Sequence, residues 1–353
     1  MNYRGIGSTG LRVSEIGFGT GDNAGLMVKG TPEDMERAVA RALDLGVNYF
    51  DCSPDYGKGV AETNLGRILR KLGRRPVITT KIEIGPQNLD DIRGRVLVSI
   101  EESLRRLQVD SVDFLEIHNA PALQHDPKTE DVVRAQGEHS FGPPWIPLVV
   151  DDYLGPDGAL GALQQLRRDG KVRFFGFACE HAEAGAAKRL LDTGYFSIIN
   201  VWLNLMNPTS GWPKPSGLTV DYDYGQLIDY AAAHGAGVAV IRPLAGGVLS
   251  RQAAGTEGRH PLAGGGMSRS PAPFLAEVRR ASALNFLVDG DRSLAQAAYQ
   301  FNLSHPGVST VVGGYSDLSQ IEEAVGCSGA GPLTEAELRR VAEVWQADFR
   351  LPA

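Results

Sequence analysis

The feature that most constrains the fold is a pattern that recurs eight times along the 353-residue chain. Each repeat has a short apolar segment, a polar loop, and then a segment with apolar residues at helical spacing. Short apolar segments rich in Val, Ile and Phe are typical of strands buried on both faces of a parallel sheet. The expected strands are Glu15–Gly19, Asn48–Asp51, Val77–Lys81, Val112–His118, Val172–Ala178, Ser197–Trp202, Gly237–Pro243 and Val308–Gly314.

Helices are expected between these strands, and two of them carry clear terminal signals. Thr31 is placed as an N-cap with Pro32 at the first helical position, and Gly46 is expected to stop that helix. Near the C-terminus, Thr334 and Glu337 form a capping box that opens a last helix outside the eight repeats. The remaining helices are expected around Leu65–Leu72 and Val96–Leu107, and over Ala159–Arg168, Ala182–Asp192, Tyr224–His234, Ser293–Ser304 and Leu318–Val325.

Alternating strands and helices predict parallel pairing with right-handed crossovers. Eight units in about 300 residues fit a closed (β/α)8 barrel better than an open two-domain sheet. No linker or change in composition divides the chain, so we expect one domain over residues 1–353. The longest connection, Asn119–Gly158, follows the fourth strand, and connections of this length are typically functional or disordered. Its several prolines lead us to expect that part of it is ordered.

Composition narrows the class of protein. The formal net charge of −7 argues against a nucleic-acid partner, because phosphate backbones attract clustered Lys and Arg. No apolar run reaches the length of a membrane span, and the N-terminal residues do not resemble an export signal. Cys52, Cys179 and Cys327 are too scattered for a disulfide framework or a metal cluster. We therefore expect a soluble protein of the reducing cytoplasm, with no metal and a small-molecule substrate.

Chemistry-bearing residues stand at three successive strand ends. The second strand ends at Asp51 and leads into Tyr56, the third ends at Lys81, and the fourth ends at His118. Because the carboxyl ends of barrel strands meet at one rim, these four side chains are expected to lie together. Taken alone, Asp51 is more typical of a strand-end cap, and His118 is more typical of a core histidine. The combination of the four residues at successive strand ends favours a catalytic site.

These four residue types suit proton transfer to a forming alcohol. Hydride reduction of a carbonyl needs an acid, and free tyrosine has a pKa near 10, too high for easy exchange at neutral pH. A neighbouring ammonium lowers that pKa, and a carboxylate keeps the ammonium charged. Tyr56, Lys81 and Asp51 fit these roles, and His118 is expected to donate a hydrogen bond to the carbonyl oxygen.

The segments that hold these residues resemble the aldo-keto reductase superfamily. The resemblance implies a (β/α)8 barrel, hydride transfer with NADPH or NADH, and an N-terminal β-hairpin over Arg4–Val13 that closes the barrel floor. It also implies that Asp51, Tyr56, Lys81 and His118 form the catalytic tetrad. The matching segments are Gly17–Thr20, Phe50–Gly57, Thr80–Lys81, Ile117–Asn119, Gly170–Gly176 and Arg242–Gly247.

The same resemblance places an extended dinucleotide across the barrel mouth. Two positions depart from the family pattern: Ala178-Cys179 stands where Ser-Asn usually holds the nicotinamide carboxamide, and Asn200 stands where Gln is usual. Gly246 and Gly247 are favoured as a backbone cradle for the pyrophosphate over a simple tight turn. The implied cofactor contacts are Gly19, Thr20, Ala178, Cys179, Asn200, Arg242, Leu244, Gly246, Gly314, Ser316, Asp317, Gln320 and Glu323.

The choice of nucleotide depends on the last strand–helix junction. Members that prefer NADPH usually carry Lys or Arg there to pair with the 2′-phosphate, and residues 308–324 contain neither. Asp317 is expected to accept a hydrogen bond from a free ribose hydroxyl, which favours NAD over NADP. With Gln320 it also forms a pattern that simply starts a helix, and both readings stay open. A basic residue elsewhere, such as Arg251, would reverse the preference.

Substrate recognition is expected in the long loops, with Asn119 and Trp145 as candidate substrate contacts and an aldehyde, ketone or sugar as the substrate class. Trp145 and Trp212 either line a pocket or pack their own loops. The altered positions Ala178, Cys179 and Asn200 also suit a second function, a regulatory or redox-sensing subunit that binds cofactor with little turnover. A non-redox isomerase or lyase is a remote third possibility, since no cluster of metal-ligand residues is apparent.

Overall fold

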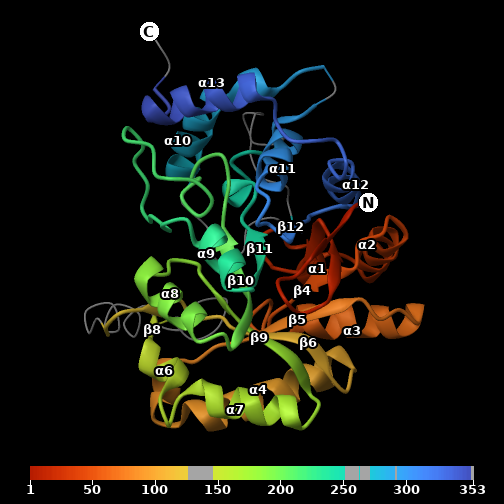
Figure 1. The fold of residues 1–353 in the computed structure, drawn as a ribbon. Coiled ribbons are helices and arrows are strands. Elements are labelled where there is room, and N and C mark those ends of the chain that lie inside the picture. Colours follow the sequence, from red (N-terminus) through yellow and green to blue (C-terminus); the bar gives the residue numbers. More distant parts are fainter. Residues whose placement is uncertain (126–145, 251–261, 263–270, 291, 351–353) are drawn as a thin grey trace.

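The structure is a computed structural model that describes residues 1–125, 146–250, 262, 271–290 and 292–350. Eight parallel strands close into a barrel in the order β10-β11-β12-β3-β4-β5-β6-β9, with helices around it (Figure 1). This confirms the predicted (β/α)8 barrel. The strands are β3 (Ile16–Gly19), β4 (Tyr49–Asp51), β5 (Val77–Ile82), β6 (Val112–Ile117), β9 (Val172–Ala178), β10 (Phe196–Trp202), β11 (Gly237–Ile241) and β12 (Thr310–Gly314).

The predicted helices are present, with some differences at their ends. The Thr31 side chain accepts a hydrogen bond from the backbone N–H of Asp34 at the start of α2, and Gly73 ends α3 in the left-handed region. Helix α9 is shorter than predicted, because the backbone N–H of Tyr224 donates to the Thr209 hydroxyl rather than joining a helix. The helices are α2 (Pro32–Asp44), α3 (Val60–Leu72), α4 (Ile92–Leu107), α7 (Ala159–Arg168), α8 (Ala184–Asp192), α9 (Leu227–Ala233), α11 (Leu294–Ser304), α12 (Leu318–Val325) and α13 (Glu335–Gln346).

Several short elements lie in the connections and were not predicted. The long connection after β6 is ordered at both ends, where β7 pairs in parallel with β8 before α6 begins. Residues 126–145 of that connection lie outside the described part of the chain. The additional elements are α1 (Leu26–Lys29), η1 (Pro86–Asp91), β7 (Pro121–Ala122), β8 (Leu148–Val149), α6 (Val150–Leu154), η2 (Ala245–Gly247), α10 (Pro271–Ala281) and η4 (Ser282–Leu287).

An N-terminal hairpin covers one end of the barrel, as the resemblance implied. Strands β1 (Tyr3–Gly5) and β2 (Arg12–Ser14) pair antiparallel. Gly7 lies in the turn between them with φ +43°, and a Cβ there would come within 2.7 Å of the Gly237 nitrogen. Only glycine fits this approach to the start of β11. The fully buried residues that join the hairpin to the barrel interior are Ile6, Val13, Tyr49, Phe114, Ile198, Ala239 and Val312.

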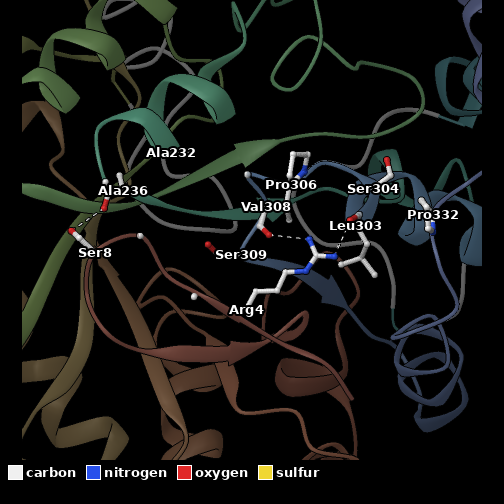
Figure 2. A pocket seen from close by; sticks show the side chains of 14 residues that line it. Arg4, Ser8, Ala232, Ala236, Leu303, Ser304, Pro306, Val308, Ser309 and Pro332 are labelled. Carbon is white, nitrogen blue, oxygen red and sulfur yellow. Dashed lines mark hydrogen bonds between the residues drawn. The ribbon is translucent and has the colours of Figure 1, made fainter.

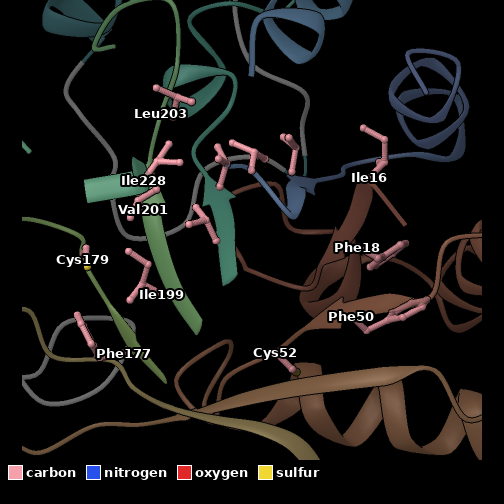
Figure 3. Close-up of a cluster of buried hydrophobic side chains, with 14 of the residues drawn as sticks. Ile16, Phe18, Phe50, Cys52, Phe177, Cys179, Ile199, Val201, Leu203 and Ile228 are labelled. Atoms are coloured by element: carbon pink, nitrogen blue, oxygen red, sulfur yellow. The ribbon is translucent and has the colours of Figure 1, made fainter. Parts of the chain in front are cut away.

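Two layers of buried side chains arise because successive residues of a strand point to opposite faces. One set packs outward against the helices, and Figure 3 shows Phe18, Phe50, Phe177 and Ile199 among its members. The other set points into the barrel. It is apolar at the hairpin end and becomes polar toward the carboxyl ends of the strands. The polar members of that upper layer are Asp51, Lys81, Glu116, His118 and Asn200.

The C-terminal helix α13 begins with the predicted capping box. The Thr334 hydroxyl accepts from the Glu337 backbone N–H at 3.2 Å, and the Glu337 carboxylate accepts from the Thr334 N–H at 2.7 Å. At its other end, Trp345 Nε1 donates to the Leu205 carbonyl at 2.7 Å. The helix is thereby fastened to the connection after β10. No helix in the described ranges is both long and apolar enough to cross a bilayer.

Candidate active site

An ion pair at the carboxyl ends of β4 and β5 forms the centre of the site. Lys81 Nζ lies 2.6 Å from Asp51 Oδ1 and also donates to the Cys52 carbonyl at 3.1 Å. Both side chains are almost fully buried, at 2% and 4% exposure. Burial opposes the ammonium form, but the negative charges of Asp51 and Glu116 outweigh it and raise the pKa of Lys81. Lys81 is therefore a fixed positive charge at neutral pH.

Tyr56 lies against this pair from the loop that follows β4. Its hydroxyl is 3.5 Å from Lys81 Nζ, and the ammonium lies 5.3 Å from the centre of the phenol ring. The lowering of the Tyr56 pKa that was expected from Lys81 is outweighed by other effects. Burial raises that pKa well above 10, and Asp51 and Glu180 raise it further. The phenol consequently holds its proton throughout the neutral range.

His118 completes the set of four predicted residues. Its ring meets the Tyr56 ring edge to face with centroids 6.0 Å apart. Its Nδ1 atom lies 2.9 Å from Glu83 Oε1 and 3.4 Å from Ser53 Oγ. Burial, assisted by the charge of Lys81, lowers the pKa of His118 well below 6.5, so the imidazole is neutral. The structure thus brings all four residues together at one rim.

Two buried acids beside the tetrad were missed by the sequence reasoning. Glu83 stands two residues after Lys81, and Glu116 stands two residues before His118. Period-two alternation places residues at this spacing on the same face of a strand, and that signal could have found Glu116. Neither carboxylate oxygen of Glu116 has a hydrogen-bond partner among the described residues. Burial raises the pKa of Glu116 to about 8.

Asn200 has a second role that the sequence did not indicate. Its Nδ2 donates to Asp51 Oδ2 at 3.2 Å, so β10 holds the carboxylate whose other oxygen binds Lys81. Its Oδ1 is buried and has no partner within the described part of the chain. A buried acceptor of this kind fits an amide N–H of a nicotinamide carboxamide. Ala178 and Cys179, also predicted at this end, are buried and present no oxygen or nitrogen side-chain donor.

The turn after β11 holds the glycines that were predicted to meet the pyrophosphate of a dinucleotide. Gly246 and Gly247 have φ of +69° and +93°, and η2 leaves Gly246 exposed. A Cβ on Gly246 would meet Arg242 Nη1 at 3.6 Å, and one on Gly247 would meet no described atom within 4 Å. Arg242 forms an ion pair with Glu180 at 3.0 Å and keeps a cation beside the turn. Leu244 packs against the core below it.

Residues predicted at the adenosine end take part in contacts within the protein. Asp317 accepts from the Gln320 backbone N–H at 3.1 Å, which confirms the reading in which it starts a helix. The Gln320 side chain accepts from the Ser316 N–H, and Glu323 accepts from the Ser293 hydroxyl at 2.6 Å. The other predicted positions are a buried Thr20 that donates to the Asp51 carbonyl, Gly19 packed against Gly313, Ser316 donating to the Ala24 carbonyl, and an exposed Gly314.

Asn119, a predicted substrate contact, takes part in hydrogen bonds within the protein. Its side chain accepts from the Ile84 N–H and donates to the carbonyls of Ile84 and Ile146 at 2.8 and 2.9 Å. With 1% exposure, it fastens the connection after β6. Trp145 lies outside the described residues. Trp212 stacks on Phe301 with centroids 4.7 Å apart, so it packs its loop against helix α11.

A hollow also lies at the hairpin end of the barrel, away from the tetrad (Figure 2). Arg4 is the positively charged residue in this hollow, and its guanidinium is bound by other groups of the protein. It donates to the carbonyls of Leu303 and Val308 at 2.9 and 3.1 Å and pairs with Glu15. These contacts close the barrel rather than offer a binding site. Elsewhere in the described ranges, no group of three or more His, Cys, Asp or Glu side chains is placed to hold a metal ion.

Comparisons with known proteins agree with this geometry. The sequence model of the Aldo/keto reductase family matches residues 15–346. L-galactose dehydrogenase of Arabidopsis thaliana is 27% identical over 339 residues, covering 92% of this chain and 87% of that protein. A putative voltage-gated potassium channel subunit beta of Schizosaccharomyces pombe is 28% identical, covering 97% and 92%. The solved holo form of an aldo-keto reductase from Bacillus halodurans superimposes with a TM-score of 0.68 at 22% identity, covering 98% and 97% of the two chains.

Proposed function

The chain belongs to the aldo/keto reductase family, and from that premise we propose that it interconverts a carbonyl and an alcohol with a nicotinamide cofactor, using Tyr56 to transfer the proton. The observation that carries the proposal is the line of contacts from Asp51 through Lys81 to the Tyr56 hydroxyl. A phenol, a fixed ammonium and a neutral imidazole at one rim are the groups that carbonyl reduction requires.

The side chains divide the proton work between them. When bound, the nicotinamide supplies or accepts the hydride at the substrate carbon. Tyr56 then gives its hydroxyl proton to the carbonyl oxygen, and the tyrosinate that forms is stabilised by Lys81. Asp51 keeps Lys81 charged and in place, and His118 donates a hydrogen bond to the same oxygen. Because burial keeps the Tyr56 phenol protonated, this site supports reduction more directly than oxidation.

The cofactor is held in this proposal by three parts of the rim. The left-handed turn at Gly246 and Gly247 faces the pyrophosphate with the exposed Gly246, since the Gly247 N–H donates to the Leu244 carbonyl at 2.9 Å, and Arg242 supplies a positive charge. Asn200 Oδ1 accepts from the carboxamide. Since residues 308–324 contain no Lys or Arg, the ribose end lacks a local partner for a 2′-phosphate, and we favour NAD over NADP.

The substrate in this proposal is a small aldehyde, ketone or sugar. The relative named L-galactose dehydrogenase supports a sugar-sized molecule. Three buried free cysteines, Cys52, Cys179 and Cys327, support a location in the reducing cytoplasm.

Replacement of Tyr56 by Phe tests the proton path. We expect Tyr56→Phe to lower kcat by about 10²- to 10⁴-fold while the Kd for NADH stays unchanged, because only the proton donor is removed. Activity is measured with a panel of aldehydes, ketones and sugars, using NADH and NADPH. Tyr230→Phe is the matched control, since Tyr230 lies on α9 and its hydroxyl bonds Asp192 at the surface. Equal activity of Tyr56→Phe and wild type would show that Tyr56 is not the proton donor.

A second candidate function is a cofactor-binding regulatory subunit. Ala178 and Cys179 offer no oxygen or nitrogen side-chain donor to the carboxamide, and two relatives are named as potassium channel beta subunits. Fluorescence titration with each reduced nicotinamide, followed by the same substrate panel, separates the two functions. Tight binding with no turnover on any substrate supports the regulatory role.

A further inference from the structure

Glu83 lies against the catalytic histidine and belongs to none of the predicted sites. We propose that Glu83 is a positioning residue that selects which ring nitrogen of His118 carries the proton, and so sets whether His118 donates a hydrogen bond to a substrate. The choice of the protonated nitrogen of His118 is a property of the protein itself and does not depend on a substrate. Its effect on the substrate rests on the function proposed above.

The contact between the two side chains is short and buried. Glu83 follows directly after β5, and its Oε1 lies 2.9 Å from His118 Nδ1, with side-chain exposures of 7% and 4%. The backbone holds the pair in register, because the His118 N–H donates to the Ile82 carbonyl at 2.8 Å. Ser53 Oγ is a more distant partner of the same nitrogen, at 3.4 Å. Glu83 is therefore the principal polar contact of Nδ1.

A neutral imidazole has one N–H and one lone pair, so the partner of Nδ1 determines the state of Nε2. His118 is neutral because burial and Lys81 lower its pKa. A protonated Glu83 donates its O–H to Nδ1, and the ring proton is then on Nε2. A charged Glu83 instead accepts from Nδ1–H and leaves a lone pair on Nε2. Only the first state gives Nε2 a proton to donate to a carbonyl oxygen.

The surroundings of Glu83 favour the protonated state near neutral pH. Burial raises the pKa of Glu83, and the negative charge of Asp55 raises it further. The pKa of Asp55 is itself raised to about 7, first by burial and then by Asp22. The charged and titratable groups around Glu83 are Asp55, Asp22, Lys58, Lys81, Arg95 and His118.

A rise in pH therefore has a defined direction of effect. Groups whose pKa is raised by burial lose their protons above the usual range for a carboxyl, so Asp55 loses its proton near pH 7 and Glu83 also loses its proton above that usual range. The His118 proton then moves from Nε2 to Nδ1. Carbonyl reduction becomes slower as this change proceeds, while the imidazole stays neutral throughout.

Nuclear magnetic resonance of the wild-type protein tests the selection without any turnover. In protein labelled with ¹⁵N-histidine, the two nitrogen shifts report which atom carries the proton, and a His118→Asn sample identifies the resonances. We expect Nε2–H at pH 6 and a shift toward Nδ1–H as the pH rises to 9. A His118 tautomer that is constant over this range, or a ring that becomes doubly protonated at pH 6, overturns the proposal.

A variant tests the consequence for the reaction. Glu83→Met removes the titrating partner and keeps an unbranched buried side chain. In the wild type, we expect kcat/KM for reduction to fall by about 10-fold or more above pH 7, because one hydrogen-bond donor to the transition state is lost. In the variant, this fall should disappear. The Kd for NADH should not change. A variant that keeps the wild-type pH profile overturns the proposal.

The matched control is Glu15→Gln. Glu15 is also a buried acid, but it lies at the hairpin end of the barrel and pairs with Arg4. This variant should keep the wild-type pH profile. The tautomer measurement holds whether or not Tyr56→Phe loses activity, so a failure of the proposed function is distinguishable from a failure of this inference.

Discussion

At the scale of single residues, the pKa of Tyr56 is not determined by its contact with Lys81 alone. Proximity to Lys81 alone predicts a lowered pKa, and that contact is present at 3.5 Å. The phenol is also partly buried and faces Asp51, Glu180 and Asp22, and these effects together raise its pKa. The identity of the proton donor followed from sequence spacing. Its protonation state depends on acids brought in from other loops, which spacing does not reveal.

Burial of Glu116 makes the stability of the protein fall as the pH rises from about 4.5 to about 8. Its folded-state pKa is about 8 against an ordinary value of 4.5, so the folded protein binds more protons than the unfolded chain between those values. Stability therefore falls as pH rises through this window, by up to about 1.4 kcal/mol for each pH unit.

Glu116→Gln removes this titration, so the variant should gain stability relative to wild type as the pH is raised from 5 to 8.5. Urea unfolding followed by circular dichroism at several pH values measures the difference. Glu343→Gln, an exposed substitution on α13, serves as the control and should show a difference that is independent of pH. A constant difference for Glu116→Gln would contradict the assigned pKa.

At the scale of elements, regular repeats were predicted well and irregular connections were not. Helices α7 and α12 occupy the predicted ranges, because an apolar stripe defines each of them and the Asp317 cap marks the start of α12. The short pair β7 and β8 was missed, since two-residue strands carry no periodicity. Helix α10 begins at Pro271 in a Gly-rich and Pro-rich region that reads as loop.

A close approach between α3 and α4 depends on Gly66. A Cβ at this position would lie 2.5 Å from the carbonyl carbon and 2.6 Å from the Cα of Leu107, both backbone atoms that cannot rotate away. Gly66→Ala should therefore destabilise the protein by about 1–3 kcal/mol despite the better helix propensity of alanine.

The control for Gly66→Ala is Gly161→Ala on α7, where the nearest atom to a new Cβ is the flexible Arg93 Nη1 at 3.1 Å. This substitution should be neutral or stabilise by up to about 1 kcal/mol. Urea midpoints measured by circular dichroism compare the two variants. Equal midpoints would mean that the two helices separate easily.

At the scale of the whole molecule, the barrel and the four-residue site followed from the sequence because strand ends of a parallel barrel share one rim. The link from Asn200 to Asp51 joins residues 149 positions apart across the barrel interior, and no local pattern indicates it. The contacts of Asn119 with Ile84 were not indicated for the same reason, since Ile84 lies in another connection, the one after β5.

Nucleotide preference is a property of the whole mouth of the barrel and is measured as ligand-induced stability. A ligand that binds only the folded state raises Tm according to its concentration relative to Kd. NADH should raise Tm more than NADPH at equal concentration. The reason is that residues 308–324, around Ser316 and Asp317, contain no Lys or Arg to bind a 2′-phosphate. Differential scanning fluorimetry with both nucleotides measures the shifts. A larger shift with NADPH would place a phosphate partner elsewhere in the chain.

The contacts of Arg4 have a consequence for the order in which this chain is assembled. Its guanidinium binds carbonyls 299 and 304 positions later in the chain, and β3 pairs with β12 at the same seam. During synthesis, Arg4 is therefore made 299 positions before the first of these carbonyls. Until β12 has been made, β3 lacks this partner strand and the barrel remains an open sheet with unpaired edges.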